Sequence, residues 1–256
     1  MKQISLTILA CASFVLSSVA ATNYADAVVS YDPGVDFAVG FTYSNTVLGE
    51  PSRVAPFGEA IDPFNPPYGT NQILSVGAGG SVTIKFARRI YHAPRKPFGL
   101  DFIIFGNCGF IVTNEFDLET FSYIGTPATD GSMFAHNTGI TRVSVSRDGK
   151  KFFTLEPESA PVVDALFPTD SVGNFDLPVN PTLTLEDFAG ATLADMRALY
   201  DGSAGGAGFN FRDARNENGR RVRLPWIRYV RVEVIEGKAE IDAFSAVARH
   251  WPRRAK

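Results

Sequence analysis

The stretch Gly77-Ala-Gly-Gly-Ser-Val-Thr-Ile-Lys-Phe86, followed by Gly99-Leu-Asp-Phe-Ile-Ile-Phe-Gly-Asn107, decides the fold class. In each half a glycine-containing turn leads into a short apolar run, which is typical of a buried β-strand. The second run contains a single charged residue, Asp101. A buried carboxylate must be ion-paired, hydrogen-bonded or bound to a metal, because an isolated buried charge is very unfavourable. Asp101 is therefore the best local indication of function in this stretch.

Short apolar or alternating runs bounded by turn residues recur along the chain. We predict strands over residues 27–31, 72–76, 81–86, 101–105, 142–146, 152–155, 227–234 and 243–248. Many short strands with turn signals between them indicate an all-β protein, a β-sandwich or jelly roll. The clearest hairpin joins 142–146 to 152–155 through Asp148-Gly149, a dipeptide that favours a two-residue turn with positive φ at both positions.

The pattern predicts one helix, over residues 185–200, with Thr184 as its cap and the glycines of 202–208 as its end. Two proline-rich loops, 56–68 and 160–181, are long for plain connections. Long loops on a rigid β-framework often carry function.

The N-terminus has the pattern of a signal peptide. Lys2 precedes an apolar run over residues 4–16, and Ser18-Val-Ala20 fits a cleavage site. The apolar run is shorter than the ~20 residues that span a bilayer. We therefore predict a signal peptide at 1–20, a single β-sandwich domain at 21–256, and a secreted or periplasmic protein with no membrane span.

After cleavage Cys108 is the only cysteine, so the mature chain forms no intramolecular disulfide. Its neighbours Phe105 and Phe110 predict that it is a buried apolar filler. The chain has 21 Phe and only 2 Trp, which indicates a phenylalanine-rich core. The net charge of −3 gives no indication of nucleic-acid or anionic-membrane binding. The sequence has no HExxH, P-loop, nucleophile-elbow, EF-hand or paired CxxC motif.

Acidic residues on or near the strands suggest a cation site. Asp101 and Asp242 lie in apolar strands, and Asn107 follows the strand of Asp101. Calcium takes Asp carboxylates, Asn carbonyls and backbone carbonyls from loops at strand ends. The alternative is that these carboxylates accept hydrogen bonds from loop amides or pair with arginines. The arginines in question are Arg88, Arg228 and Arg231, and the further loop acids are Glu50, Asp62, Glu115 and Asp117.

A series of short segments between residues 28 and 247 forms a recognisable pattern through its order and spacing. The segments are Tyr31-Asp-Pro-Gly34, Leu48-Gly-Glu-Pro-Ser-Arg53, Phe64-Asn-Pro66, 77–86, 98–107, 143–152, 205–209, 226–232 and 241–247. In these segments the chain resembles a family of bacterial exported "cell surface protein" domains, many of which carry a C-terminal sorting tail that this sequence lacks. In this family Glu frequently occupies the position of Gly106, before Asn107. The resemblance implies an exported β-jelly-roll domain.

More distantly, Ile241-Asp-Ala-Phe244 is similar to the last strand of jelly-roll carbohydrate-binding modules, in which the corresponding aspartate helps to hold a structural calcium ion. The similarity implies that Asp242 is a calcium ligand and that Glu50 is a further candidate ligand. Neither resemblance implies a catalytic activity.

We therefore expect a secreted, non-catalytic β-jelly-roll module that binds a glycan or another extracellular polymer and carries a structural calcium ion. Such sites present aromatic side chains from loops. The candidate ligand-binding residues are Tyr68, Tyr123 and Trp226.

Two other functions remain open from the sequence. An extracellular hydrolase would pair Asp101 with Glu115 or Asp117 as acid and base across a cleft. An adhesion protein with no small ligand would show a large exposed apolar patch instead.

Overall fold

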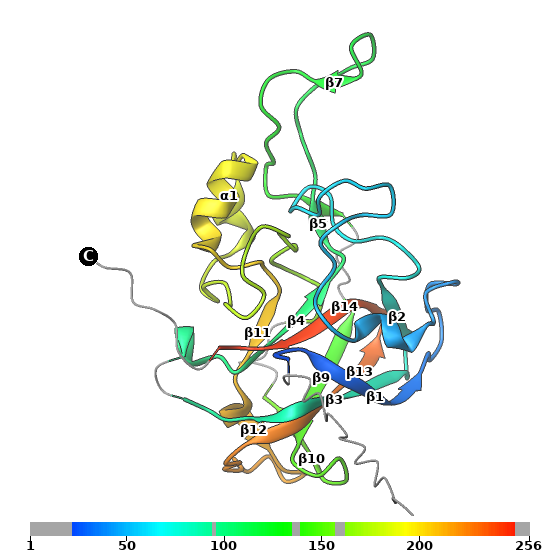
Figure 1. Ribbon diagram of the computed structural model, residues 1–256, viewed down its shortest axis with the longest axis vertical. Coiled ribbons are helices and arrows are strands. Elements are labelled where there is room, and N and C mark those ends of the chain that lie inside the picture. The colour runs from blue at the N-terminus through cyan, green and yellow to red at the C-terminus, as the bar shows by residue number, and fades with distance from the viewer. Residues whose placement is uncertain (1–21, 94–95, 135–138, 157–161, 249–256) are drawn as a thin grey trace, which may run out of the picture.

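A computed structural model describes residues 22–93, 96–134, 139–156 and 162–248 (Figure 1). The expected signal peptide, 1–20, lies outside the described residues. Within them, no helix is both long and apolar enough to cross a membrane.

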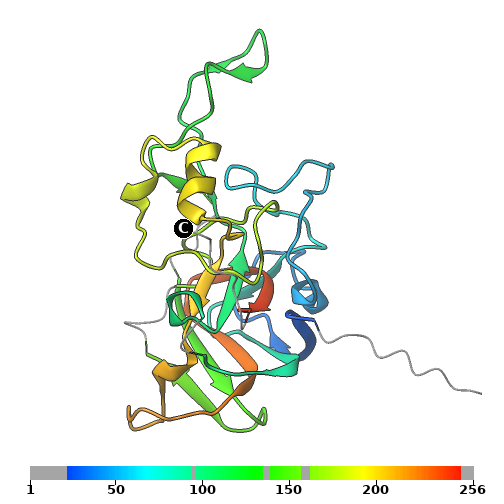
Figure 2. The same cartoon turned by 60° about the vertical axis from the view of Figure 1, so that its left-hand side comes forward.

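Two antiparallel sheets form a β-sandwich (Figures 1 and 2). The first sheet has six strands in the order β1-β3-β13-β9-β10-β12. Their bounds are Ala25–Asp32 for β1, Ser81–Ile90 for β3, Ile227–Glu236 for β13, Ile140–Ser146 for β9, Phe152–Leu155 for β10 and Ala214–Arg215 for β12. The second sheet has four strands in the order β11-β4-β14-β2. These are Ala207–Phe209 for β11, Phe102–Gly106 for β4, Lys238–Ala246 for β14 and Leu74–Gly77 for β2.

The main core lies between the two sheets. Val82 and Ile84 of β3 and Val230 of β13 contribute their inward side chains, and all three are fully buried. Phe102 of β4 and Phe244 of β14 belong to the same cluster. This alternation of buried and outward residues along β3 and β13 is what a sheet with one solvated face requires.

Strand β4 is apolar at every position because both of its faces are buried. Phe102 and Ile104 face the main core, whereas Ile103 and Phe105 belong to a second cluster with Phe175. The continuous apolar sequence of this strand, from which a buried strand is predicted, is therefore explained by burial of both of its faces. All the predicted strands are present, with ends that differ by a few residues.

The hairpin of β9 and β10 is confirmed, but its predicted turn is wrong. Ser146 pairs with Phe152, so the connection spans residues 147–151. Gly149 has φ of +73°, whereas Asp148 does not have a positive φ. Asp148 instead accepts hydrogen bonds from the amides of Lys150 and Lys151 at 2.9 and 3.0 Å. The side chain thus stabilises a wider loop with a single left-handed residue.

The predicted helix at 185–200 is two shorter pieces. A 3-10 turn, η3, covers Leu185–Phe188, and the α-helix α1 covers Leu193–Tyr200. Gly190, with φ of +78°, lies between them. Thr184 caps η3 as predicted, and Thr192 caps α1, each through a reciprocal capping box.

A hairpin, called here the arm (residues 111–132), stands apart from the sandwich in both views (Figures 1 and 2). The strands β6 and β7 pair within it, and β5 and β8 pair at its base. These strands cover Phe116–Asp117, Ser122–Tyr123, Gly109–Phe110 and Met133–Phe134 respectively. The other 3-10 turns are η1 at Ser44–Val47, η2 at Pro97–Gly99 and η4 at Phe211–Asp213.

A separate apolar cluster fixes the base of the arm against α1. Phe110 of β5 packs with Phe188, ring centroids 4.8 Å apart, and the cluster includes Met196 and Tyr200 of α1. Cys108 belongs to the same cluster and is 3% exposed, so the prediction of a buried thiol is confirmed. Burial, and then the neighbouring Asp164, raise the pKa of Cys108 well above its usual range. The cluster holds arm and helix in one fixed arrangement.

Candidate functional site

A cavity of about 730 Å³, called here the arm pocket, lies between the arm, the loop around Asp62 and the start of α1. This volume falls within the range of small-molecule sites. The lining residues are Asp62, Phe64, Val112, Tyr123, Thr126, Pro127, Thr192, Leu193, Ala194 and Arg197. Most of the wall is therefore apolar, and a few polar groups are present that can fix the orientation of a ligand.

Asp62 supplies the acceptor of the pocket. Its Oδ1 accepts hydrogen bonds from the amides of Phe64 and Asn65 at 2.8 and 3.1 Å, so a tight turn holds the carboxylate in place. Its Oδ2 accepts none from the residues that the structure describes. Burial raises the pKa of Asp62 above its ordinary value, although the two amides and the nearby Arg197 lower it in part.

Arg197 supplies the donor. Its Nε and Nη2 donate to Oδ2 and Oδ1 of Asp170 at 2.8 and 3.1 Å. Asp170 is 2% exposed in its side chain, whereas Arg197 is 40% exposed. This two-point contact fixes the guanidinium plane, and Nη1 donates to no other described residue. Two residues of the pocket lining thus have an atom without a partner among the described residues: Asp62 through Oδ2 and Arg197 through Nη1.

Aromatic rings form part of the apolar wall. Tyr123 is 40% exposed and packs edge-on against Phe116, with ring centroids 5.1 Å apart. Phe64 comes from the loop that also holds Asp62. At the helix start, Thr192 accepts a hydrogen bond from the amide of Asp195, which sets where α1 begins and where Arg197 lies one turn later.

The structure separates the three aromatic residues that the sequence suggested as ligand-binding. Tyr123 lines the arm pocket. Tyr68 is 42% exposed beside Phe57 and does not line that pocket. Trp226 lies between the guanidinium groups of Arg89 and Arg147, which are 4.3 and 4.7 Å from its ring centroid. Ligand binding by these residues stays a prediction.

Asp101 is fully buried and has three partners. Lys96 Nζ contacts Oδ1 at 3.1 Å, while His92 Nδ1 and the amide of Phe211 lie 3.2 and 3.3 Å from Oδ2. The arginines suggested from sequence are not among these partners. Burial raises the pKa of Asp101, and the charges of Lys96 and His92 lower it in part.

Asp242 accepts hydrogen bonds from a loop, as the alternative to calcium suggested. Ser52 donates its amide to Oδ2 and its hydroxyl to Oδ1, both at 2.8 Å. Burial raises the pKa of Asp242 to about 7, against the lowering effect of these two bonds. Glu50 lies in the same loop and pairs with Arg53.

Asn107 follows β4 and is 9% exposed. Its Nδ2 donates to Glu240 Oε2 at 2.6 Å, and its buried Oδ1 has no hydrogen-bond partner in the structure. The carboxylate of Asp164 accepts hydrogen bonds from the backbone amides of Asn107 and Cys108 at 2.7 and 2.9 Å.

Among the described residues, no group of three or more His, Cys, Asp or Glu side chains has the arrangement of a metal site. Asp101, Asp242 and Glu50 each have protein donors instead. The calcium ion expected from the sequence stays a prediction.

The carboxylates of the hydrolase alternative are not brought together. Asp101 is buried just before β4, whereas Asp117 lies on the arm, which stands apart from that strand (Figure 1). Asp117 accepts hydrogen bonds from Thr120 and from the amide of Glu119, both at 2.8 Å. These bonds lower its pKa.

Sequence reasoning named Asp62 only as a loop acid and did not find Arg197. The available signal was weak: Thr192 and Asp195 mark a helix start, and Arg197 follows on the next turn. Its partner Asp170 lies in the long loop after β10, and no local pattern relates the two positions. No protein-family model matches the chain, and no curated protein is significantly similar to it.

Proposed function

We propose that the protein is an exported, non-catalytic glycan-binding module and that the arm pocket is its binding site. The proposal rests on one observation: Asp62, Arg197 and Tyr123 line the same open cavity. Asp62 is an acceptor and Arg197 a donor, and each has an atom that no described residue uses.

Neighbouring hydroxyl groups of a sugar match this pair of groups. A hydroxyl both donates and accepts, so one donates to the Asp62 carboxylate while the next accepts from Arg197. The apolar face of a sugar ring can then lie against Tyr123, as aromatic side chains combine apolar area with little loss of freedom. An entirely apolar ligand would leave the Asp62 oxygen without a partner, which is unfavourable.

The electrostatics of the pocket favour binding over catalysis. Asp170, the second carboxylate nearby, uses both oxygens on Arg197. A glycosidase needs two carboxylic groups that face the same bond, one of them able to exchange a proton. Within the described lining of the pocket, Asp62 is the one carboxylate.

The test has two stages. A glycan array identifies ligands of the wild-type protein, and calorimetry then measures the affinity of the best ligand for wild type, Asp62→Asn and Tyr123→Ala. Asn retains the acceptor for the amides of Phe64 and Asn65 but loses the charge. We expect each substitution to weaken binding by roughly 10-fold or more, the usual effect of losing a charged hydrogen bond or a stacking ring.

Tyr68→Ala is the matched control, since Tyr68 is an equally exposed tyrosine outside the pocket. It should bind like wild type. Equal losses in Tyr68→Ala and Tyr123→Ala, or unchanged affinity in Asp62→Asn, would reject the arm pocket as the site. Thermal melts of each variant separate lost binding from lost folding.

A further inference from the structure

A second arrangement, unrelated to the arm pocket, surrounds Trp226. Trp226 directly precedes β13, Arg89 lies near the end of β3 and Arg147 directly follows β9. Because β13 lies between β3 and β9 in the sheet, the two arginines come from the two strands that flank β13. The two guanidinium carbons are 4.3 and 4.7 Å from the ring centroid, within the range of a cation–π contact. We call this arrangement the arginine–tryptophan stack.

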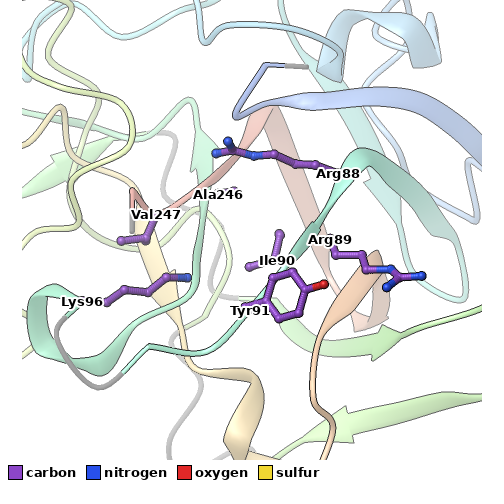
Figure 3. A pocket seen from close by; sticks show the side chains of 7 residues that line it. All are labelled: Arg88, Arg89, Ile90, Tyr91, Lys96, Ala246 and Val247. Carbon is purple, nitrogen blue, oxygen red and sulfur yellow. The ribbon is translucent and has the colours of Figure 1, made fainter. Parts of the chain in front are cut away.

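An irregularity in β3 positions Arg89. The pairing of β3 with β13 passes from Ile90↔Ile227 to Lys85↔Tyr229, so β3 has extra residues between the two pairs. Such bulges re-aim side chains. Figure 3 shows the guanidinium groups of Arg88 and Arg89 pointing in opposite directions, with Arg88 on the side of Lys96 and Ala246. Arg89 is thereby directed away from those residues.

The donors of the stack are not used within the described protein. Arg89 and Arg147 are exposed, and neither donates a hydrogen bond or forms an ion pair with a described residue. A guanidinium that lies over an aromatic ring keeps its N–H groups as donors, and no described residue uses them here. A planar guanidinium with unused N–H groups can bind a carboxylate through two parallel hydrogen bonds.

The surroundings are basic although the whole chain is acidic. Apart from Arg88, which points the other way (Figure 3), the segments Ser81–Ile90, 140–151 and Ile227–Glu236 contain eight Lys and Arg against three Asp and Glu. Another aromatic ring on this face is also covered by a cation, because Arg231 lies over Phe152 at 3.9 Å. A ligand on this side of the sheet meets positive charge.

We infer that the arginine–tryptophan stack is a second binding site, for the carboxylate groups of an acidic polysaccharide. The positive charge of this face complements the negative charge of an anionic polymer. The planar guanidinium groups match the geometry of carboxylates. Single-stranded nucleic acid fits less well, because its bases stack on free aromatic faces. Here the rings of Trp226 and Phe152 are already covered by Arg side chains. The inference does not depend on the glycan site in the arm pocket, with which the stack shares no residue.

Affinity for polygalacturonate, measured by calorimetry, tests the inference. The Arg89→Gln/Arg147→Gln protein should bind roughly 10-fold or more weakly than wild type. Arg89→Lys/Arg147→Lys keeps the charge but loses the planar fork, and should also bind clearly more weakly. Raised salt should weaken the wild-type complex. Arg212→Gln/Arg220→Gln removes the same charge from exposed arginines elsewhere and should bind like wild type.

Fluorescence gives a second readout that does not depend on overall affinity. The protein has two tryptophans, so a Trp251→Phe background reports Trp226 alone. Polygalacturonate should change its emission, and neutral dextran should not. All variants should melt like wild type.

Three results would overturn the inference. The first is wild-type affinity in Arg89→Gln/Arg147→Gln. The second is an equal loss in Arg212→Gln/Arg220→Gln, which would show an effect of net charge only. The third is single-stranded DNA that binds as tightly as polygalacturonate and displaces it, which would make nucleic acid the ligand.

Discussion

Asp101 and Asp242 are both buried carboxylates, yet their surroundings give them different properties. Asp101 has the ammonium group of Lys96 beside it, so its negative charge is compensated, and the ring of His92 lies at its other oxygen. Within the described part of the chain, Asp242 has only the neutral donors of Ser52, and burial raises its pKa to about 7. A carboxyl group without a cation in an apolar strand therefore retains its proton far above the usual range.

Asp242 should make the protein less stable as the pH rises from about 4 to about 7. In that window the folded state keeps the proton of Asp242, whereas the unfolded state, with an ordinary pKa near ~3.9, has lost it. The free energy of unfolding then falls by up to about 1.4 kcal/mol per pH unit from this group. Asp242→Asn, which still accepts the Ser52 amide, removes this dependence.

Denaturant unfolding of wild type and Asp242→Asn across this pH range checks the prediction. The stability of wild type relative to the variant should fall through the window and level off above pH ~7, where Asp242 is ionised in both states. A relative stability that stays constant or rises with pH contradicts the proposed surroundings of Asp242.

At the scale of elements, the end of β4 depends on a carboxylate from a distant loop. Asp164, with a left-handed φ of +62°, accepts the amides of Asn107 and Cys108 directly after β4. Its carboxylate fills the space where a side chain on Gly106 would begin. Gly106 is therefore required by the close approach of Asp164.

Gly106→Ala should destabilise the protein by roughly 1–3 kcal/mol, because the new methyl group meets the Asp164 carboxylate. In an Asp164→Gly background the same substitution should cost much less, since the obstacle is gone. Urea unfolding of the four proteins measures this coupling. Equal costs in the two backgrounds would show that Asp164 does not restrict Gly106.

Local pattern predicted the strands well because each apolar run is short and bounded by turn residues, as in 101–105 and 227–234. It predicted the helix less well: the apolar spacing continues across Gly190, whereas the backbone turns left-handed there. The carboxylate partners were harder still. Ser52 and Asp242 are 190 residues apart, and Asp170 and Arg197 come from a loop and a helix. Such pairs follow from the sheet order and loop paths, which no local window contains.

At the scale of the whole molecule, the sandwich supports two regions of different chemistry. The arm and its flanks contain no Lys or Arg from Pro97 to Thr141, whereas β3, β9 and β13 together contain one Lys and five Arg. The arm tip, residues 116–123, contributes no residue to the buried clusters. Its Leu118 and Phe121 are 80% and 81% exposed. The sandwich therefore provides stability, and the arm contributes mainly to the pocket.

Shortening the arm separates these roles. Replacing residues 116–123 by Asn-Gly joins Glu115 to Ile124, whose amide already donates to the Glu115 carbonyl at 2.8 Å. Asn-Gly suits a two-residue hairpin. The shortened protein should melt within a few degrees of wild type, because no buried cluster loses a residue.

The glycan-array profile of this shortened protein beside wild type tests glycan recognition by the arm pocket most directly. We predict that the glycans bound by wild type are lost when Tyr123 is removed with the arm tip, while the Arg89→Gln/Arg147→Gln protein keeps its neutral glycans. The same glycans at the same intensity on the folded, shortened protein would contradict the account.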